Sequence, residues 1–349
     1  MEADKNVSEK TPEQKTSWLK LLLALLLGLG LLWFAFKDCD FEMILANRKD
    51  LDIIYLVIVF ITGLLSHIVR ALRWIWLLKP VANRSISLWN SFYATIVGYA
   101  VNVVIPRGGE VARLVAISRM EKLPWAAVLP TMFIDRLLDI ASLVILIGVS
   151  LTILPRQILD EMPWLVPGGA TMAFISVVAL VLLPRTHSIL SWIQKQPFID
   201  KILPQPVKEK LSELSAQFDR GTKSLLDPVA YPVIALFTVV MWILYGLNFY
   251  FMLFAFHIQD KVGIKNCLLT FTIGSSGNLI PTPGTIGTFH VLVKESLVKT
   301  AQIEPNLAAA YATVLHLMCF IVVTCVPAAV CVAVNGMLGA RRKNPEETP

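Results

Sequence analysis

Long apolar stretches without a charged side chain recur along this 349-residue chain. Eight of them contain no Asp, Glu, Lys or Arg, and most approach the roughly 20 apolar residues that cross a bilayer as a helix. They cover residues 21–36, 53–69, 85–106, 140–155, 162–184, 228–259, 266–293 and 305–340. This pattern predicts an all-α polytopic membrane protein.

Composition agrees with this prediction and argues against nucleic acid, a metal ion or a cofactor as a partner. Hydrophobic residues make up 56% of the chain and charged residues only 16%, which is too apolar for an ordinary soluble domain. In a membrane protein the net charge of +6 points to cytoplasmic loops and anionic lipids, so we expect no nucleic-acid partner. The five cysteines show no C-x-x-C spacing, and we expect no metal and no cofactor.

The distribution of Lys and Arg distinguishes two topologies, because these residues accumulate on the cytoplasmic side. If all eight stretches cross the bilayer from a cytoplasmic N-terminus, 14 basic residues lie inside and 17 outside. If stretches 85–106 and 266–293 instead enter and return as re-entrant hairpins, the count becomes 23 inside against 8 outside. We therefore predict six spanning helices and two re-entrant helical hairpins in the cytoplasmic (inner) membrane, with both termini cytoplasmic.

This topology also predicts the domain organisation. We expect a disordered cytoplasmic tail over residues 1–17, one transmembrane domain over 18–340 and a second cytoplasmic tail over 341–349. The transmembrane domain divides into a first repeat of about 51–155, a cytoplasmic interfacial segment at 185–227 and a second repeat of about 228–340. Within the interfacial segment, alternating charged and apolar residues indicate a helix over 207–224.

The two predicted hairpins resemble each other in sequence. Asn90, Gly98 and Asn102 match Asn266, Gly274 and Asn278 at a constant offset of 176 positions. The charge-derived topology makes the two units inverted, and inverted repeats with Pro/Gly-interrupted segments are common in secondary transporters. Ordinary turns between spanning helices are the alternative. The residues expected at the hairpin breaks are Asn102, Pro106, Asn278, Pro281, Pro283, Gly284 and Gly287.

Charged residues follow the first hairpin at helical spacing. Glycines let backbone N–H groups approach a ligand, and arginines supply forked donors that match phosphate oxygens. We therefore expect a phosphate-bearing headgroup here, with the carboxylates orienting the arginines. The alternatives are topology signals and plain salt bridges at helix ends. The candidate headgroup residues are Arg107, Gly108, Gly109, Glu110, Arg113, Asp135, Arg136 and Asp139.

Other polar residues in apolar stretches receive simpler interpretations. His290 and His316 are candidate proton relays, although packing histidines are the commoner case. Arg70 and Arg73 are expected to anchor the end of a helix at the interface beside Trp74. The chain has no Walker A, H-E-x-x-H or G-x-S-x-G motif, so no catalytic residue is assigned.

Together these motifs resemble the flippase-like transmembrane family, the membrane half of lysylphosphatidylglycerol synthases, over roughly residues 18–339. The resemblance lies in Arg70-Ala-Leu-Arg-Trp74, Asn102-x-x-x-Pro106-Arg107-x-Gly109-Glu110-x-x-Arg113, Asp135-Arg136-x-x-Asp139 and Pro281-x-Pro283-Gly284-x-x-Gly287. The chain departs from the family pattern at Asp135, where Glu is usual, and at Thr285, which replaces the second glycine of a Pro-Gly-Gly run.

The resemblance implies a non-enzymatic role in lipid translocation. The expected function is a flippase for a phospholipid or another lipid-linked headgroup, with a membrane lipid of anionic headgroup as substrate and a homo-oligomer or partner enzyme as candidate associate. The synthase reaction belongs to a separate cytoplasmic domain of the family and is not carried over. A membrane scaffold for a lipid-modifying or glycosyl-transferring enzyme, or a small-solute secondary carrier, remains the alternative.

Overall fold

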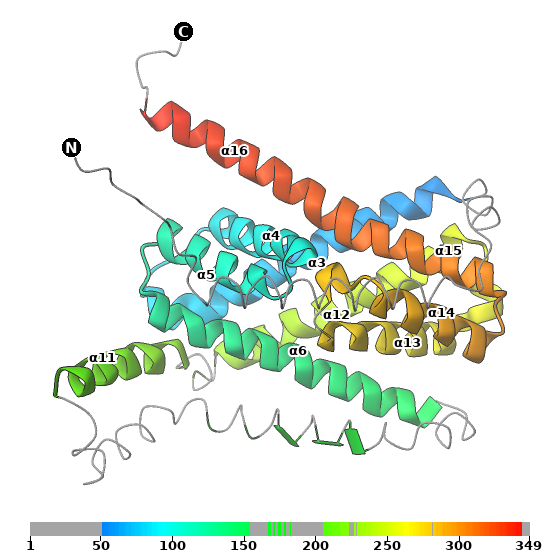
Figure 1. The fold of residues 1–349 in the computed structure, drawn as a ribbon, viewed down its shortest axis with the longest axis horizontal. Coiled ribbons are helices and arrows are strands. Elements are labelled where there is room, and N and C mark those ends of the chain that lie inside the picture. Colours follow the sequence, from blue (N-terminus) through cyan, green and yellow to red (C-terminus); the bar gives the residue numbers. More distant parts are fainter. Residues whose placement is uncertain are drawn as a thin grey trace, which may run out of the picture.

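A computed structural model of the chain describes residues 51–153, 205–222, 227, 229–280 and 282–343, with a few helical positions between 167 and 182. Within these residues all regular structure is helical, as predicted (Figure 1). The predicted span at 21–36, most of that at 162–184, the segment 185–204 and the predicted tail at 1–17 lie outside the described residues. Of the tail predicted at 341–349, only residues 341–343 are described, and they continue α16.

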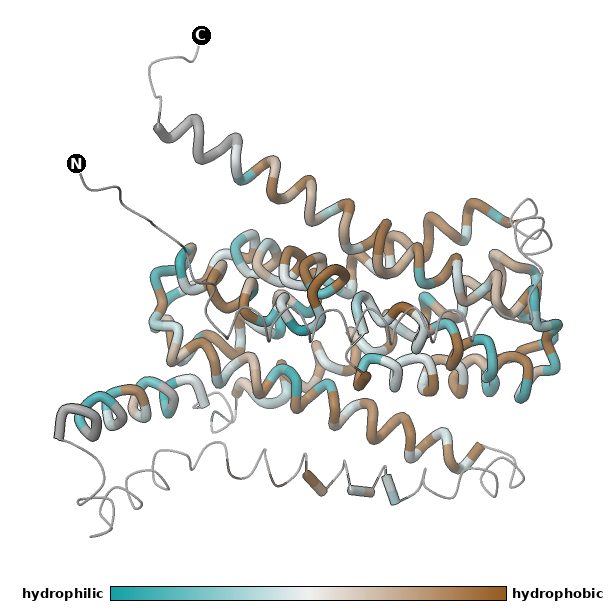
Figure 2. The backbone as a smooth tube through the Cα atoms, in the orientation of Figure 1, coloured by the Kyte–Doolittle hydropathy of each residue, from teal (hydrophilic) through white to brown (hydrophobic). Residues whose placement is uncertain are grey.

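Four long helical segments are apolar enough to cross a membrane. They are α3 (Ile53–Ala82), α6 (Trp125–Ile153), α12 (Ala230–Ala255) and a final segment whose apolar part is Pro305–Gly336. The final segment consists of α15 (Pro305–His316), a π-helix η5 (Leu317–Cys325) and α16 (Val326–Lys343). Figure 2 shows these helices as mostly hydrophobic. They correspond to four of the six predicted spans.

Helix α6 begins well before the predicted span at 140–155. The uncharged stretch put the start of this span at residue 140, but Asp135, Arg136 and Asp139 lie inside α6. The prediction was wrong at this boundary because it treated charge as incompatible with a helix interior. In the structure these charges face other helices and are paired there.

Local sequence signals explain where several helices begin and end. The Asp52 side chain accepts a hydrogen bond from the Ile54 N–H at 2.9 Å and so caps the start of α3. At the end of α4 (Leu88–Val104), Ile105 is extended, which is the conformation favoured before a proline such as Pro106. Helix α15 starts with Pro305 after the capping side chain of Glu304.

The two predicted hairpins correspond to two pairs of packed helices. In the first pair, α4 packs against α5 (Gly108–Met120). In the second, α13 (Gln259–Ser276) packs against α14 (Thr288–Ala301), and two short 3₁₀ turns, η3 (Gly277–Leu279) and η4 (Pro283–Thr285), connect them. Each pair is longer than predicted, because the returning arm is a separate helix that continues past the uncharged stretch.

The connecting turns of the two pairs meet inside the molecule. A Cβ atom built on Gly284 would lie 3.3 Å from a Val103 side-chain carbon and 3.4 Å from the Val103 carbonyl oxygen. The turn of the second pair therefore packs directly on the end of α4. Gly284 and Val103, which are 181 positions apart in sequence, thus lie in contact.

Around these pairs the long helices build the apolar core. Helices α3 and α12 pack along each other, and Val59, Met252 and Leu253 are buried there. The charged helix α11 (Gln205–Thr222) matches the helix predicted at 207–224 and packs on α6, where a Cβ on Gly221 would clash with the Ala127 carbonyl oxygen at 2.3 Å. Its position along the cytoplasmic interface stays a prediction.

Candidate functional site

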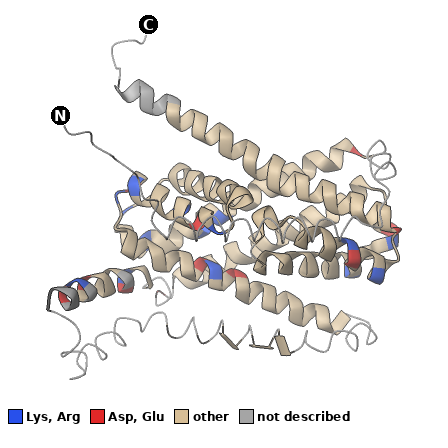
Figure 3. Ribbon diagram, viewed as in Figure 1, with Lys and Arg blue, Asp and Glu red and all other residues tan. Residues whose placement is uncertain are grey.

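A cluster of charged side chains lies inside the helical body, where α3, α5 and α6 meet. Figure 3 shows it as a group of basic and acidic residues surrounded by uncharged helices. Helix α3 contributes two arginines, α5 an arginine and a glutamate, and α6 two aspartates and an arginine. We call these seven residues the charged cluster: Arg70, Arg73, Glu110, Arg113, Asp135, Arg136 and Asp139.

Asp135 is the centre of the charged cluster and is completely buried. Its carboxylate accepts hydrogen bonds from Arg73 Nε at 3.0 Å and Nη2 at 2.6 Å, and from Arg113 Nη1 at 2.7 Å. Arg70 Nη1 lies 3.4 Å from the same carboxylate. A buried carboxylate is costly unless it is paired, and here three guanidinium groups surround it.

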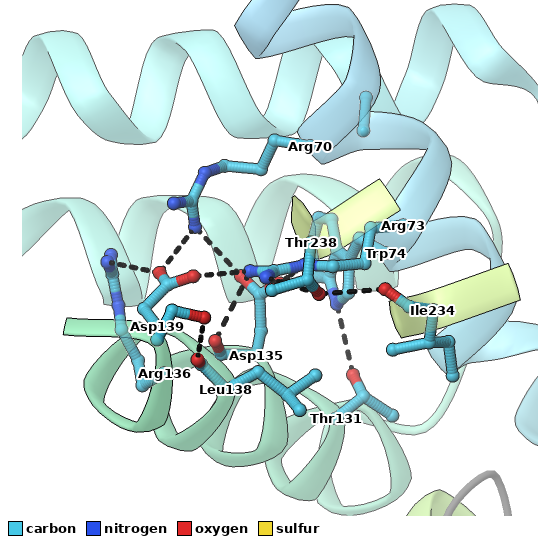
Figure 4. Close-up of polar contacts among 12 residues, drawn as sticks. Arg70, Arg73, Trp74, Thr131, Asp135, Arg136, Leu138, Asp139, Ile234 and Thr238 are labelled. Carbon is cyan, nitrogen blue, oxygen red and sulfur yellow. Dashed lines mark hydrogen bonds and ion pairs between the residues drawn. The ribbon is translucent and has the colours of Figure 1, made fainter. Parts of the chain in front are cut away.

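Asp139 links the same arginines one helical turn further along α6 (Figure 4). Its two oxygens accept from Arg70 Nη1 at 2.8 Å and from Arg73 Nη2 at 2.7 Å. The spacing explains the match: two arginines three apart on α3 face two aspartates four apart on α6, so each pair shares one side of its helix. The Thr238 hydroxyl of α12 also accepts a hydrogen bond from Arg73 Nη1, at 3.2 Å.

The third carboxylate of the charged cluster, that of Glu110, forms an ion pair that is more exposed than those of the two aspartates. Arg136 donates to Glu110 across the contact between α6 and α5, and its Nη1 lies 3.5 Å from the Tyr99 hydroxyl. The Arg136 and Glu110 side chains are 36% and 32% exposed, whereas Asp135 is fully buried. The charged cluster therefore has a sealed centre and an open edge.

Arg113 is buried but incompletely bonded. Its side chain is 2% exposed and stacks on Trp74, with the guanidinium carbon 3.7 Å from the ring centroid. Its Nε and Nη2 groups have no hydrogen-bond partner among the described residues, and neither has the buried hydroxyl of Thr95. Both residues line a narrow polar pocket whose other walls include Tyr99, Asn102, Glu110 and Arg136.

The charged cluster carries an excess of positive charge. Four guanidinium groups face three carboxylates, which leaves one unit of positive charge in a largely buried site. The unpaired donors of Arg113 likewise show that the site has too few acceptor groups for its arginines. The arrangement is chemically suited to receive an anion.

Two glycines bring the first helix pair close enough to form this pocket. A Cβ on Gly109 would lie 1.8 Å from the Gly98 carbonyl oxygen, and one on Gly98 would lie 2.9 Å from the Gly109 carbonyl oxygen. Only glycine allows such an approach of two backbones. The Gly109 N–H donates to Asn102 Oδ1 at 2.8 Å, so Asn102 satisfies the backbone beside the turn, as its position at a predicted break suggested.

The structure brings together five of the predicted headgroup residues: Glu110, Arg113, Asp135, Arg136 and Asp139. Gly109 lines the adjacent pocket, and Gly108 begins α5, where a Cβ would clash with Ile105. Arg107 is different. It is exposed, makes no ion pair with a described residue and occupies the N-cap of α5 with a left-handed φ of 61°.

The interpretation of Arg70 and Arg73 as interface anchors was wrong. Both are buried among carboxylates, nine or more residues before the end of α3. The count of basic residues put them at the end of a helix because it takes no account of ion pairs between helices. The available signal was the Arg-x-x-Arg spacing in an apolar helix together with the Asp-x-x-x-Asp spacing in α6, two patterns that are complementary when they face each other.

At the turn of the second pair, the left-handed backbone falls on Gly284, Thr285 and Gly287, with φ values of 55°, 56° and 86°. Thr285 thus adopts the conformation for which the family pattern has glycine, and the tight turn is kept. His316 Nε2 lies 2.8 Å from the Gly284 carbonyl oxygen, and the His290 and His316 rings are 4.8 Å apart. Proton relay by these histidines stays a prediction.

The remaining predicted break residues show simpler placements. Asn278 is exposed and donates to the Ser275 carbonyl oxygen at 3.2 Å, Pro283 is buried, and Pro281 lies outside the described residues.

No group of three His, Cys, Asp or Glu residues is arranged to hold a metal ion in the described part of the chain.

An apolar groove of about 640 Å³ runs between α3, α4 and α16, and α4 also lines the polar pocket. Its walls are almost entirely carbon, so it is suited to hydrocarbon. The residues that line it include Phe60, Leu64, Ile68, Trp89, Phe92 and Val330.

Comparison with known proteins agrees with this combination of features. The family model described as the lysylphosphatidylglycerol synthase TM region matches residues 20–326. A UPF0104 membrane protein of Methanocaldococcus jannaschii is 23% identical over 128 residues, which is 36% of this chain and 37% of that protein. The alignment therefore spans little more than a third of this relative. No solved structure matches.

Proposed function

The chain belongs to the lysylphosphatidylglycerol synthase transmembrane-region family, and from that premise we propose that it moves an anionic lipid across the cytoplasmic membrane. The observation that carries this proposal is the charged cluster with its excess positive charge and the unpaired donors of Arg113. Ionisable residues inside apolar helical bundles are expensive and normally belong to a transport path. A lipid phosphate carries the negative charge and the acceptor oxygens that these arginines bind.

The apolar groove supports a lipid over a soluble anion. It lies on the α16 side of α4 and offers a hydrocarbon-lined path next to the helix that borders the polar pocket. An amphiphile needs both surfaces, one for its headgroup and one for its acyl chains, whereas a small solute needs only the first.

The two helix pairs provide the element that moves in this proposal. We assign them as re-entrant hairpins that form an inverted repeat, entering from opposite sides and meeting where Gly284 packs on Val103. Without the four arginines of the charged cluster, the remaining basic residues still divide 19 inside against 8 outside, which supports this assignment, as does the match of Asn102 with Asn278. In it six helices span the inner membrane and both termini are cytoplasmic.

The proposal assigns no catalytic step to the charged cluster. Its side chains are arginines and carboxylates in mutual ion pairs, which bind and orient an anion. Recognition and release of a headgroup are sufficient for translocation, so we assign this chain a non-enzymatic role.

The test is lipid movement in reconstituted vesicles. Fluorescent phosphatidylglycerol is placed in both leaflets, and an impermeant quencher reports how fast the inner population reaches the outer leaflet. We expect the wild type to accelerate this exchange and Arg136→Gln to lower the rate by tenfold or more, because a charge-assisted hydrogen bond contributes about 1.5 to 3 kcal/mol. Lys299→Gln, in an exposed pair with Glu295, is the matched charge control.

Two results would contradict the proposal. If Arg136→Gln stays folded and transports at the wild-type rate, the charged cluster does not bind the headgroup. If the wild type itself does not accelerate exchange with any lipid tested, the scaffold function replaces the flippase function.

A further inference from the structure

Glu110 is the carboxylate of the charged cluster that is easiest to displace. Asp135 is fully buried under three arginines, and Asp139 is 15% exposed and bonds two. Glu110 is 32% exposed and has a single partner among the described residues, Arg136, which is itself 36% exposed. Breaking this pair costs less than freeing either aspartate, because Glu110 loses one guanidinium partner and is less buried, whereas Asp135 and Asp139 each lose more than one.

The same carboxylate stands where an anion would bind. The unpaired Nε and Nη2 groups of Arg113 belong to the narrow pocket that Glu110 and Arg136 also line. An anion that reaches these donors lies beside the Glu110 carboxylate, and like charges at such short range repel strongly away from water. The pocket has no free volume for a water molecule, so a ligand anion reaches Arg136 only by taking the place of the Glu110 carboxylate.

We propose that Glu110 occupies the position of a phosphodiester on Arg136 and is exchanged for it when a lipid headgroup binds. This inference rests on the proposed function and adds the residue that determines specificity. One negative charge replaces another, so the exchange keeps the balance of the charged cluster only for a headgroup of net negative charge. A zwitterionic headgroup brings its own cation into a site that already has an excess of positive charge.

Arg107 is the group that receives the displaced carboxylate. It lies at the N-cap of α5, three residues before Glu110, is exposed and pairs with no described carboxylate. A carboxylate in the first turn of a helix is also stabilised by the free N–H groups there. This gives a role to an arginine that the structure places outside the charged cluster.

The experiment measures binding of two short-chain lipids to the purified full-length protein in detergent by native mass spectrometry. Phosphatidylglycerol is the anionic probe and phosphatidylcholine the zwitterionic one. We expect Glu110→Gln to bind phosphatidylglycerol at least tenfold more tightly than the wild type, with binding of phosphatidylcholine unchanged. Glu110→Asp, which is one methylene shorter and reaches Arg136 less well, should lie between them. Glu295→Gln neutralises a remote exposed carboxylate and should match the wild type.

Arg136→Gln separates the two hypotheses. If it weakens phosphatidylglycerol binding while Glu110→Gln and Glu110→Asp bind no more tightly than the wild type, the exchange is refuted and the headgroup site stands. If the wild type does not prefer phosphatidylglycerol and Arg136→Gln changes nothing, the headgroup site fails and the exchange fails with it. Arg107→Gln should weaken phosphatidylglycerol binding severalfold, and unchanged binding would refute its role as receiver.

Discussion

Replacing Asp135 by asparagine should destabilise the protein more than any other single neutralisation in the charged cluster. The substitution keeps the shape of the side chain but removes the negative charge that faces Arg70, Arg73 and Arg113. It also directs an amide N–H₂ group toward guanidinium donors, so at least one hydrogen bond becomes a contact between two donors. The excess positive charge of the cluster rises from one to two.

The magnitude follows from the burial of the pair. Removing one partner of a buried ion pair typically costs about 3 to 5 kcal/mol, because the remaining charge stays desolvated and unpaired. With about 2 to 4 °C of melting temperature per kcal/mol for a domain of a few hundred residues, we expect a decrease of roughly 6 to 20 °C. Asp139→Asn should cost less, since Asp139 is 15% exposed and water can replace part of its interaction.

Thermal unfolding in detergent, followed by circular dichroism or by size-exclusion chromatography of heated samples, measures this difference. Glu295→Gln, which neutralises an exposed carboxylate on α14, serves as the control and should change the melting temperature by less than about 2 °C. The double variant Asp135→Asn with Arg113→Gln should recover part of the loss, because it removes one of the unpaired charges. A melting temperature of Asp135→Asn equal to that of the control would refute the view that this carboxylate holds the charged cluster together.

Three further substitutions test other parts of the fold by the same assay. Gly109→Ala should prevent stable folding, because its Cβ would lie 1.8 Å from the Gly98 carbonyl oxygen, and a normal melting curve would contradict the close approach. Thr285→Gly should stabilise the protein by about 1 kcal/mol by relieving a left-handed β-branched residue, and destabilisation would show that its side chain matters more than its backbone. Glu121→Gln should cost about 1.5 to 3 kcal/mol, since this buried carboxylate forms an ion pair with Arg84 at 2.8 Å and accepts hydrogen bonds from the Ser87 N–H and Asn90 at 3.2 and 2.7 Å; an unchanged melting temperature would refute that estimate.

The sequence predicted most of the scaffold because the relevant signals are local. Uncharged stretches located four spans that the structure also contains, and the Pro106 and Gly284 turns fall within the predicted hairpins. Helical spacing singled out five of the seven residues of the charged cluster, Glu110, Arg113, Asp135, Arg136 and Asp139. Each of these inferences needs only neighbouring residues, whose conformational preferences are encoded within one or two helical turns.

What could not be predicted depends on contacts between distant helices. The pairing of Arg70 and Arg73 with α6 joins residues more than 60 positions apart, and hydropathy along the chain does not reveal which helices face each other. The same limit explains the early start of α6 and the returning arms α5 and α14. In this fold the charges in apolar helices are paired with opposite charges on other helices. A single sequence does not show which residue provides the opposite charge.

The order of the charged cluster along the chain has a consequence for biosynthesis. Arg70, Arg73 and Arg113 are made before their common partner Asp135, which follows them by 65, 62 and 22 residues. An arginine at the centre of a transmembrane helix costs roughly 2.5 to 3.5 kcal/mol on the scale measured for translocon insertion. Helix α3 therefore leaves the ribosome with two such charges and no carboxylate to neutralise them. We expect it to stay beside protein or water until α6 is synthesised, so that the two helices enter the lipid together.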